Sequence, residues 1–184
     1  MEKKEKNIVI GICGSIAAYK VPGLIRQLKG LGWGMRFIMT KEAEQFITRL
    51  TIETVGQSPV YTDMFEREHA WEISHVSLGE SGRFLLVIPA TANIIGKAAN
   101  GIADDLLSAT IMAFAGTVIF APAMNFRMWE NPIVQENVKK LKQNGFLFVG
   151  PVEGKLADGS SGIGRMTEIE DIIKFLEKEA GKNG

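Results

Sequence analysis

The sequence has very few of the side chains that build metal centres and disulfide bonds. Its 184 residues include one cysteine, Cys13, and two histidines, His69 and His75. A single cysteine excludes an internal disulfide bond and a multi-cysteine zinc site, and two histidines argue against a histidine-rich metal site. The sequence therefore predicts no metal. The scarcity of cysteine fits a reducing cytoplasm, where we expect the protein to reside.

An excess of charge of one sign and a long apolar segment are also missing. The 21 basic and 21 acidic side chains cancel, so no net field attracts nucleic acid or an anionic membrane. The apolar run at residues 8–12 is shorter than the core of a signal peptide, and no segment approaches the length of a membrane span. We expect a single domain over residues 1–184 that binds neither nucleic acid nor membrane.

Short β-branched and aromatic runs alternate with stretches of helical periodicity. Five runs have the length and composition of strands, namely 7–12, 35–40, 84–88, 117–121 and 146–149. Pro59 makes residues 60–61 an expected edge strand. Helices are expected over 41–50, 94–98, 106–115 and 133–142, and a last one after a capping box formed by Thr167 and Glu170. This alternation predicts an α/β fold, a parallel, doubly wound sheet in three layers.

Four of these strands end in small or hydroxyl-bearing residues, which would meet at one edge of a parallel sheet. They are Gly14 with Ser15, Thr40, Thr91 with Asn93, and Ala123 with Asn125. Ligands of open α/β sheets bind at this edge, where a serine at a helix start can meet a phosphate. We infer one extended ligand with a phosphate at one end. The G-x-x-G-S spacing matches neither the dinucleotide fingerprint nor the Walker loop, however, and such a turn can simply connect a strand to a helix.

The stretch 117–132, TVIFAPAMNFRMWENP, places polar and thioether groups directly after a strand. Pro122 stops that strand because it cannot donate to a sheet ladder. The amide of Asn125 offers one acceptor and two donors, enough to hold a carboxylate. The alternative is a β-to-α connection in which Asn125 only forms the turn, while Met128 and Trp129 belong to the core.

Six segments, taken together, are similar to those of the flavin-containing cysteine decarboxylases, and within that family to the phosphopantothenoylcysteine decarboxylases of coenzyme A biosynthesis. They read GSIAAYK from Gly14, SHVSL around His75, PATAN from Pro89, GIADDLLS from Gly101, PAMNFRMW from Pro122, and a glycine-rich stretch over 155–166. The PAMNxxMW pattern with an upstream histidine is specific to this family, whereas the first turn alone is not.

The resemblance implies a flavodoxin-like (Rossmann-like) domain that binds FMN and decarboxylates a cysteinyl carboxylate, with phosphopantothenoylcysteine converted to phosphopantetheine. The implied FMN-binding residues are Gly14, Ser15, Ile16, Thr40, Thr91, Ala92, Asn93, Ile94 and Ala123. His75 would be the base, and Asn125 would hold the substrate carboxylate. The residues implied to contact the substrate are Asn125, Met128, Lys155, Ala157 and Met166. The resemblance also implies homotrimers that can pack into dodecamers, with the flavin between subunits.

The flap of this family corresponds to residues 150–166, and one position in it departs from the family pattern. Its five glycines predict a mobile loop. The biosynthetic enzymes carry a cysteine in a Leu-Ala-Cys-Gly context that helps protonate the enethiolate, whereas this chain reads Leu-Ala-Asp-Gly with Asp158. An aspartate with a raised pKa can donate that proton, which makes Asp158 a candidate catalytic residue. Alternatively the reaction stops at the enethiol, or Asp158 is only a turn residue.

Other functions stay open from the sequence. The chain could be a peptidyl-cysteine oxidative decarboxylase that releases an enethiol, a flavin prenyltransferase-like protein, or a non-catalytic FMN-binding flavoprotein. PAMNFRMW argues against the prenyltransferase, and the presence of both His75 and Asn125 argues against a non-catalytic role. The usual bacterial decarboxylase is fused to a synthetase domain, for which 184 residues leave no room. We therefore expect a separate synthetase chain if the protein serves coenzyme A biosynthesis.

Overall fold

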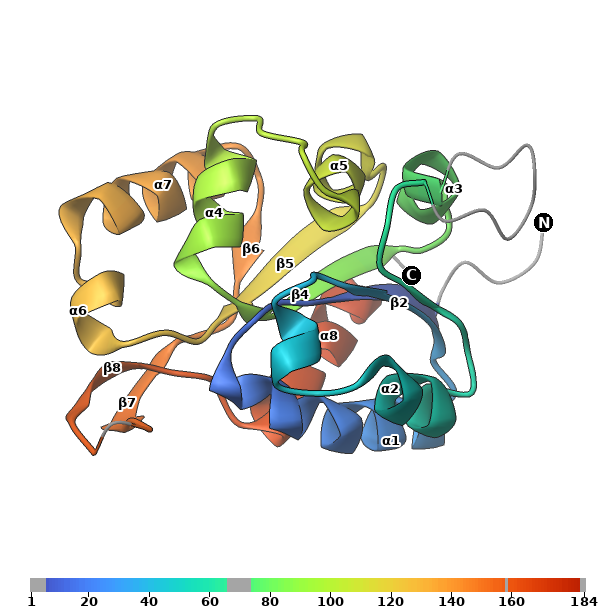
Figure 1. The fold of residues 1–184 in the computed structure, drawn as a ribbon, viewed down its shortest axis with the longest axis horizontal. Coiled ribbons are helices and arrows are strands. Elements are labelled where there is room, and N and C mark those ends of the chain that lie inside the picture. Colours follow the sequence, from blue (N-terminus) through green and yellow to red (C-terminus); the bar gives the residue numbers. More distant parts are fainter. Residues whose placement is uncertain (1–5, 66–73, 158, 183–184) are drawn as a thin grey trace.

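A six-stranded parallel sheet runs through the middle of the protein (Figure 1). The structure, a computed structural model, describes residues 6–65, 74–157 and 159–182, without the side chains of 74–76. The strands are β1 (Asn7–Ile12), β2 (Gly34–Met39), β3 (Val60–Tyr61), β4 (Phe84–Ala90), β5 (Thr117–Pro122) and β6 (Leu147–Phe148). Their order is β3-β2-β1-β4-β5-β6, with every neighbouring pair parallel. The order reverses between β1 and β4, and ligands of such sheets bind at this switch point.

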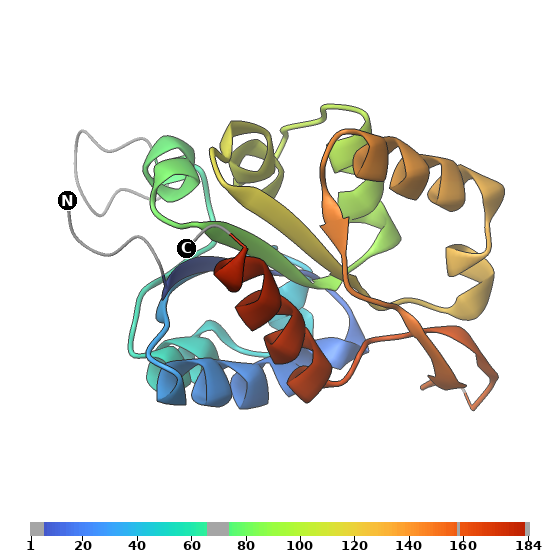
Figure 2. The same ribbon diagram turned by 180° about the vertical axis from the view of Figure 1, so that it is seen from behind.

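Helices cover both faces of the sheet, which confirms the predicted three-layer, doubly wound arrangement (Figures 1 and 2). One face carries α1 (Val21–Gly30), α2 (Arg49–Gly56) and α8 (Ile169–Gly181). The other carries α3 (Ser74–Glu80), α4 (Ala92–Ala99), α5 (Leu106–Ala113) and α7 (Pro132–Gln143). Short helical segments η2 (Ile16–Lys20), η3 (Ala43–Gln45) and α6 (Phe126–Trp129) follow strands β1, β2 and β5.

Alternate side chains of the strands divide the core in two. Ile8, Ile10 and Ile12 of β1 pack with α1 and α8, whereas Val9 packs with α4, α5 and α7 on the opposite face. A strand buried on both faces reads as a continuous apolar run, as β1 and β4 do. The two cores hold the strands in place, so the positions of the turns at their carboxyl ends are fixed.

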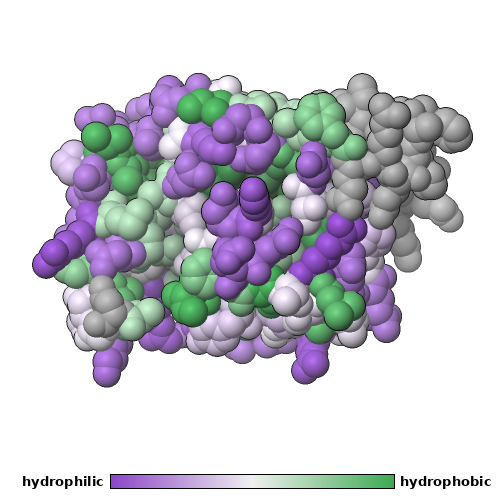
Figure 3. Space-filling model, viewed as in Figure 1, coloured by the Kyte–Doolittle hydropathy of each residue, from purple (hydrophilic) through white to green (hydrophobic). Residues whose placement is uncertain are grey.

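Apolar side chains at the surface form separate patches among hydrophilic ones on the face seen in Figure 3. The most exposed large apolar residues include Phe65, Leu50 and Ile133, which come from different parts of the chain. None of the helices within the described ranges is long and apolar enough to cross a membrane.

Two local predictions for the helices were wrong. The stretch 41–50 is not one helix, because η3 ends at Gln45 and α2 begins only at Arg49, with Thr48 accepting a hydrogen bond from the backbone N–H of Thr51. Thr167 does not cap α8. It is buried, its Oγ1 has no hydrogen-bond partner in the described part of the chain, and Glu168 takes the cap position without a side-chain bond.

Candidate active site

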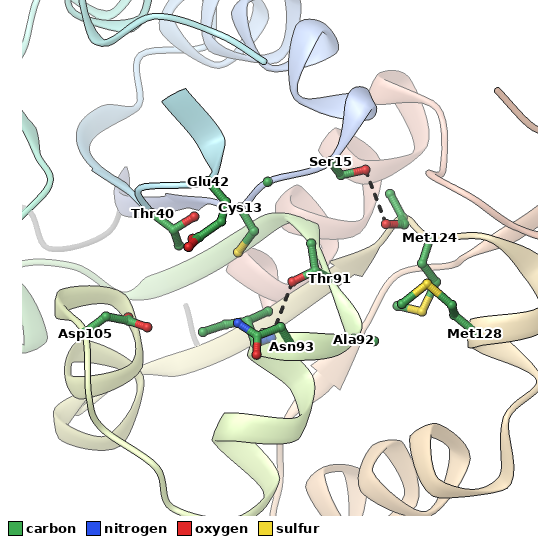
Figure 4. Close-up of a pocket in the computed structure, with 13 residues that line it drawn as sticks. Cys13, Ser15, Thr40, Glu42, Thr91, Ala92, Asn93, Asp105, Met124 and Met128 are labelled. Carbon is green, nitrogen blue, oxygen red and sulfur yellow. Dashed lines mark hydrogen bonds between the residues drawn. The ribbon is translucent and has the colours of Figure 1, made fainter. Parts of the chain in front are cut away.

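The turn after β1 is tied to the end of β5 by one side chain. The Ser15 hydroxyl donates a hydrogen bond to the Ala123 carbonyl at 3.4 Å (Figure 4). It also accepts one from the backbone N–H of Ala17 at 3.4 Å. Ser15 therefore caps η2 and also joins two strand ends that are 108 residues apart in the chain. This explains why a serine follows the glycine at this turn.

The turn after β4 has the same design. Thr91 caps α4, its Oγ1 accepting the backbone N–H of Ile94 at 3.4 Å. The first N–H groups of a helix have no carbonyl partner within it, and the helix dipole is positive at that end. Because η2 and α4 both begin at this edge, their amino ends are suited to anionic or polar groups of a ligand.

A cavity of about 290 Å³ lies where these turns meet (Figure 4). It is lined by Cys13, Gly14, Ser15, Thr40, Glu42, Thr91, Ala92, Asn93, Ile94, Asp105, Ala123, Met124 and Met128. Of the nine residues that the resemblance assigns to FMN, eight are among them. Four different strands thus contribute to one cavity, as the strand-end pattern predicted. Cys13, Glu42, Asp105 and Met124 are lining residues that the sequence reasoning missed.

The thiol of Cys13 lies within this cavity wall and is almost completely buried. Burial is the main cause that raises its pKa to about 12, because it penalises the charged thiolate. At neutral pH the group is therefore a protonated thiol. It is not poised to act as a nucleophile or as a proton donor of ordinary acidity.

The start of α5 brings two carboxylates and a cation together beside the cavity. Asp105 caps α5, with its Oδ1 accepting the backbone N–H of Ser108 at 2.8 Å. Lys97 Nζ lies 2.6 Å from Asp105 Oδ2 and 2.7 Å from Asp104 Oδ1. Burial alone would lower the pKa of Lys97, but its hydrogen bonds to Asp104 and Asp105 outweigh this and raise it. The same hydrogen bond with Lys97 lowers the pKa of Asp104.

A second cavity, of about 540 Å³, adjoins the first and shares Ser15, Ala123 and Met124 with it. Its other lining residues are Ile16, Ala17, Tyr19, Lys20, Asn125, Lys155, Leu156, Ala157, Gly164, Arg165 and Met166. Four of the five residues assigned to the substrate line this larger cavity, together with Ile16, which had been assigned to FMN. Met128 lines the smaller cavity instead. Three cations, those of Lys20, Lys155 and Arg165, line the larger cavity. Glu168 pairs with two of them, with Lys20 at 3.5 Å and with Arg165.

Asn125 has two roles in this structure. Its Oδ1 accepts the backbone N–H of Arg127 at 2.9 Å and so caps α6, and the residue also lines the larger cavity. The turn-forming function is therefore real without excluding a ligand. Met128, which is 49% exposed, is not a core residue, whereas Trp129 packs partly buried against the core formed by α4, α5 and α7.

The glycine-rich stretch 150–166 is not an irregular loop, which corrects the sequence prediction. It forms an antiparallel hairpin of β7 (Val152–Lys155) and β8 (Ser161–Arg165). The Met124 N–H donates a hydrogen bond to the Gly164 carbonyl at 3.0 Å, which joins β8 to the turn after β5. A side chain on Gly164 would collide with the Met124 carbonyl and would lie 3.1 Å from the Phe126 nitrogen. The glycine thus permits close backbone approach on either side of Asn125.

The structure describes no side chain for two of the predicted catalytic residues. Asp158 lies outside the described residues, between Ala157, which lines the larger cavity, and Gly159. His75 lies in α3, but its side chain is not described. Among the residues that the structure describes, α3 contributes none to either cavity, and the Gly79 carbonyl near its end accepts the N–H of Ala115 at 3.2 Å.

A family model and curated proteins of known sequence both match nearly the whole chain. The model of the Flavoprotein family covers residues 1–181. The coenzyme A biosynthesis bifunctional protein CoaBC of Borreliella burgdorferi is 43% identical over 176 residues, which are 96% of this chain and 45% of that protein. The probable phosphopantothenoylcysteine decarboxylase of Streptococcus mutans is 36% identical and is matched over 98% of its length by 95% of this chain.

Solved structures of cysteine decarboxylases also superpose on nearly the whole chain. A cysteine-to-serine variant of PPC decarboxylase, complexed with pantothenoylaminoethenethiol, superposes with a TM-score of 0.88 at 27% identity, covering 96% of this chain and 98% of that one. The FMN-dependent cysteine decarboxylase SpaF superposes with a TM-score of 0.81 at 33% identity, covering 95% of this chain and 97% of that one. The chain spans less than half the length of the bifunctional relatives it matches. With a family model matched over residues 1–181 and relatives above 30% identity, the chain belongs to the Flavoprotein family.

Proposed function

We propose that the protein is an FMN-dependent decarboxylase of a cysteinyl carboxylate, with phosphopantothenoylcysteine as substrate and phosphopantetheine as the product of the complete cycle. The observation that carries this proposal is the pair of adjoining cavities. One is built from four strand ends with hydroxyl and amide groups, and the other combines Asn125 with three cations. The name of the relative from Streptococcus supports the same substrate, and the name of the relative from Borreliella supports a role in coenzyme A biosynthesis.

The smaller cavity fits the chemistry of FMN. The hydroxyls of Ser15, Thr40 and Thr91 and the amino ends of η2 and α4 supply donors for a phosphate and for sugar hydroxyls. Ala92 and Ala123 keep two walls small. When bound, FMN supplies the hydride acceptor that a cysteinyl carboxylate lacks, since such a carboxylate has no electron sink of its own.

The larger cavity fits a substrate with an anion at each end. The amide of Asn125 would hold the reacting carboxylate, and Ala157 would contact the substrate from the hairpin. Met166, which is buried in the core, would contribute to the cavity wall. Lys20, Lys155 and Arg165 would hold a phosphate at the other end. The cations favour this small substrate, which carries a phosphate as well as a carboxylate, over a peptide tail whose cysteine brings only the carboxylate.

His75 is proposed as the base, because an imidazole changes protonation state near neutral pH. Since α3 lines neither cavity in the described part of one chain, we propose that His75 reaches the site of a neighbouring copy. A homotrimer, alone or within a dodecamer, would place the cofactor between subunits in this way.

The fate of the oxidised product depends on Asp158. Cys13 cannot replace the flap cysteine as a ready proton donor, because its pKa is raised to about 12 by burial. A free thiol has a pKa about 4.6 units above that of aspartate, a gap of roughly 6 kcal/mol that burial of Asp158 would have to offset in large part. We therefore propose inefficient completion of the cycle, with enethiol release favoured. Peptidyl-cysteine decarboxylases are among the structural relatives, and they support the second candidate function, oxidative decarboxylation of a peptide.

An anaerobic incubation with phosphopantothenoylcysteine tests the proposal. The purified protein should be yellow, with about one FMN per chain, and its flavin spectrum should bleach on addition of substrate. Mass spectrometry should find a product that has lost carbon dioxide. Absence of flavin after reconstitution, or a substrate recovered unchanged, would refute the decarboxylase. Turnover of a peptide with a carboxy-terminal cysteine in its place would favour the second candidate.

A further inference from the structure

The charges around the smaller cavity are unfavourable for an anionic cofactor at first sight. Its lining, as far as the chain is described, includes no lysine or arginine but two carboxylates, Glu42 and Asp105. A carboxylate near a phosphate disfavours the charged form of both. Some other group must compensate at least one of these charges if a phosphorylated flavin is to bind.

Lys97 is placed to do so from behind the cavity wall. It lies in the last turn of α4, and its side chain is only 18% exposed. Its ammonium bonds to Asp105 Oδ2 at 2.6 Å, while Asp105 Oδ1 caps α5. Both oxygens of the lining carboxylate are therefore engaged, one by a cation and one by a backbone N–H.

The field of these groups extends to the thiol of Cys13 in the cavity wall. Burial is the main cause of its raised pKa, and a backbone hydrogen bond from Thr91 opposes it. The charges of Asp105 and Glu42 raise that pKa further, whereas the charge of Lys97 lowers it. The cation thus counteracts the carboxylates at the wall of the cavity.

We propose that Lys97 is a positioning residue for the cofactor cavity, which holds and neutralises Asp105 so that the cavity accepts a phosphorylated flavin. The inference rests on the proposed function for the presence of FMN. FMN and riboflavin differ only in the phosphate. The preference of the protein for FMN over riboflavin then depends on a residue that does not itself line the cavity. A phosphate monoester carries a charge of about −1.5 to −2 at pH 7, so it senses an uncompensated carboxylate that riboflavin does not.

Binding of FMN and of riboflavin to the apoprotein, measured by quenching of flavin fluorescence, tests this proposal. Lys97→Met should weaken FMN binding about tenfold and riboflavin binding less than about twofold. Raising the ionic strength from about 0.01 M to about 1 M shortens the Debye length from about 30 Å to about 3 Å and should reduce the difference. Lys97→Arg should retain the FMN preference of the unmodified chain.

Two further variants separate charge from structure. Asp104→Asn leaves the Lys97–Asp105 pair in place and should keep the ratio of the two affinities. Asp105→Asn combined with Lys97→Met removes both charges, and because asparagine caps helices as well as aspartate does, it should restore the ratio. Equal weakening of both flavins by Lys97→Met, or no recovery in the double variant, would overturn the role of Lys97 alone. An unmodified chain that binds neither flavin would overturn the proposed function and this inference with it.

Discussion

The contact between the hairpin and the turn after β5 permits a quantitative prediction for Gly164→Ala. The new methyl group would press on the Met124 carbonyl and the Phe126 nitrogen, so the two backbones must separate by on the order of 1 Å. Overpacking of this kind costs about 1 to 3 kcal/mol, and loss of the hydrogen bond from the Met124 N–H to the Gly164 carbonyl costs about 1 kcal/mol more. We expect thermal unfolding to show a decrease in Tm on the order of 10 °C.

The same displacement would move Asn125, which lies between the two contacts. A misplacement of about 1 Å at a positioning group can lower kcat/KM by about 100-fold, and steady-state kinetics with phosphopantothenoylcysteine would measure it. Gly30→Ala is the matched control, because no atom lies within 4 Å of its new methyl group at the end of α1. It should leave activity unchanged and raise stability by up to about 1 kcal/mol. A Gly164→Ala variant with parental Tm and parental kcat/KM would refute the reasoning, and a lowered Tm with unchanged kcat/KM would show that Asn125 is not held by the hairpin.

Four other outcomes are expected. His75→Asn should retain FMN, but its flavin should no longer be bleached by substrate under anaerobic conditions. If each site combines residues of two copies, co-expression of this variant with an Asn125→Asp chain should restore about a quarter of the activity. No recovery would place both residues in the site of one chain. Asn125→Asp alone should weaken substrate binding, measured by titration, since like charges repel, and unchanged affinity would place the substrate carboxylate elsewhere. Asp158→Cys should shift the product identified by mass from the enethiol to the saturated thiol. A parent chain that already returns its flavin to the oxidised form in full would contradict this prediction. Cys13, with its pKa raised to about 12 by burial, should resist iodoacetamide at pH 8 in the folded protein and react only after denaturation, and rapid labelling of the native chain would contradict the burial.

The convergence of the strand ends was predictable from the sequence. A parallel sheet brings the carboxyl ends of all its strands to one edge, so the hydroxyls of Ser15, Thr40 and Thr91 share a cavity although they follow three different strands. Short apolar runs identify such strands well because both faces of the sheet are buried. Fold and cavity therefore follow from patterns that are local in the chain.

The charged part of the site was not predictable in the same way. Lys97 has the sequence context of an ordinary cation in the last turn of a helix, and only the packing of α4 against α5 brings it into contact with Asp105.

The hairpin was not predicted for a different reason. Glycine usually signals a flexible turn, but Gly162 and Gly164 are needed where β8 touches Phe126 and Met124. Sequence spacing contains neither kind of contact, because the first depends on the turn that joins α4 to α5 and the second on how distant segments meet.

The wall shared by the two cavities has a consequence for the order of events. Ser15, Ala123 and Met124 face both spaces, so a molecule in the smaller cavity becomes part of the surface that the larger one offers. Under the proposed function, the apoprotein has an incomplete substrate site, and loading is sequential, cofactor before substrate. The coupling is reciprocal, so a substrate that binds more tightly to the loaded protein must raise the affinity of the protein for its cofactor by the same factor. Cellular substrate would in this way protect the flavin content of the protein.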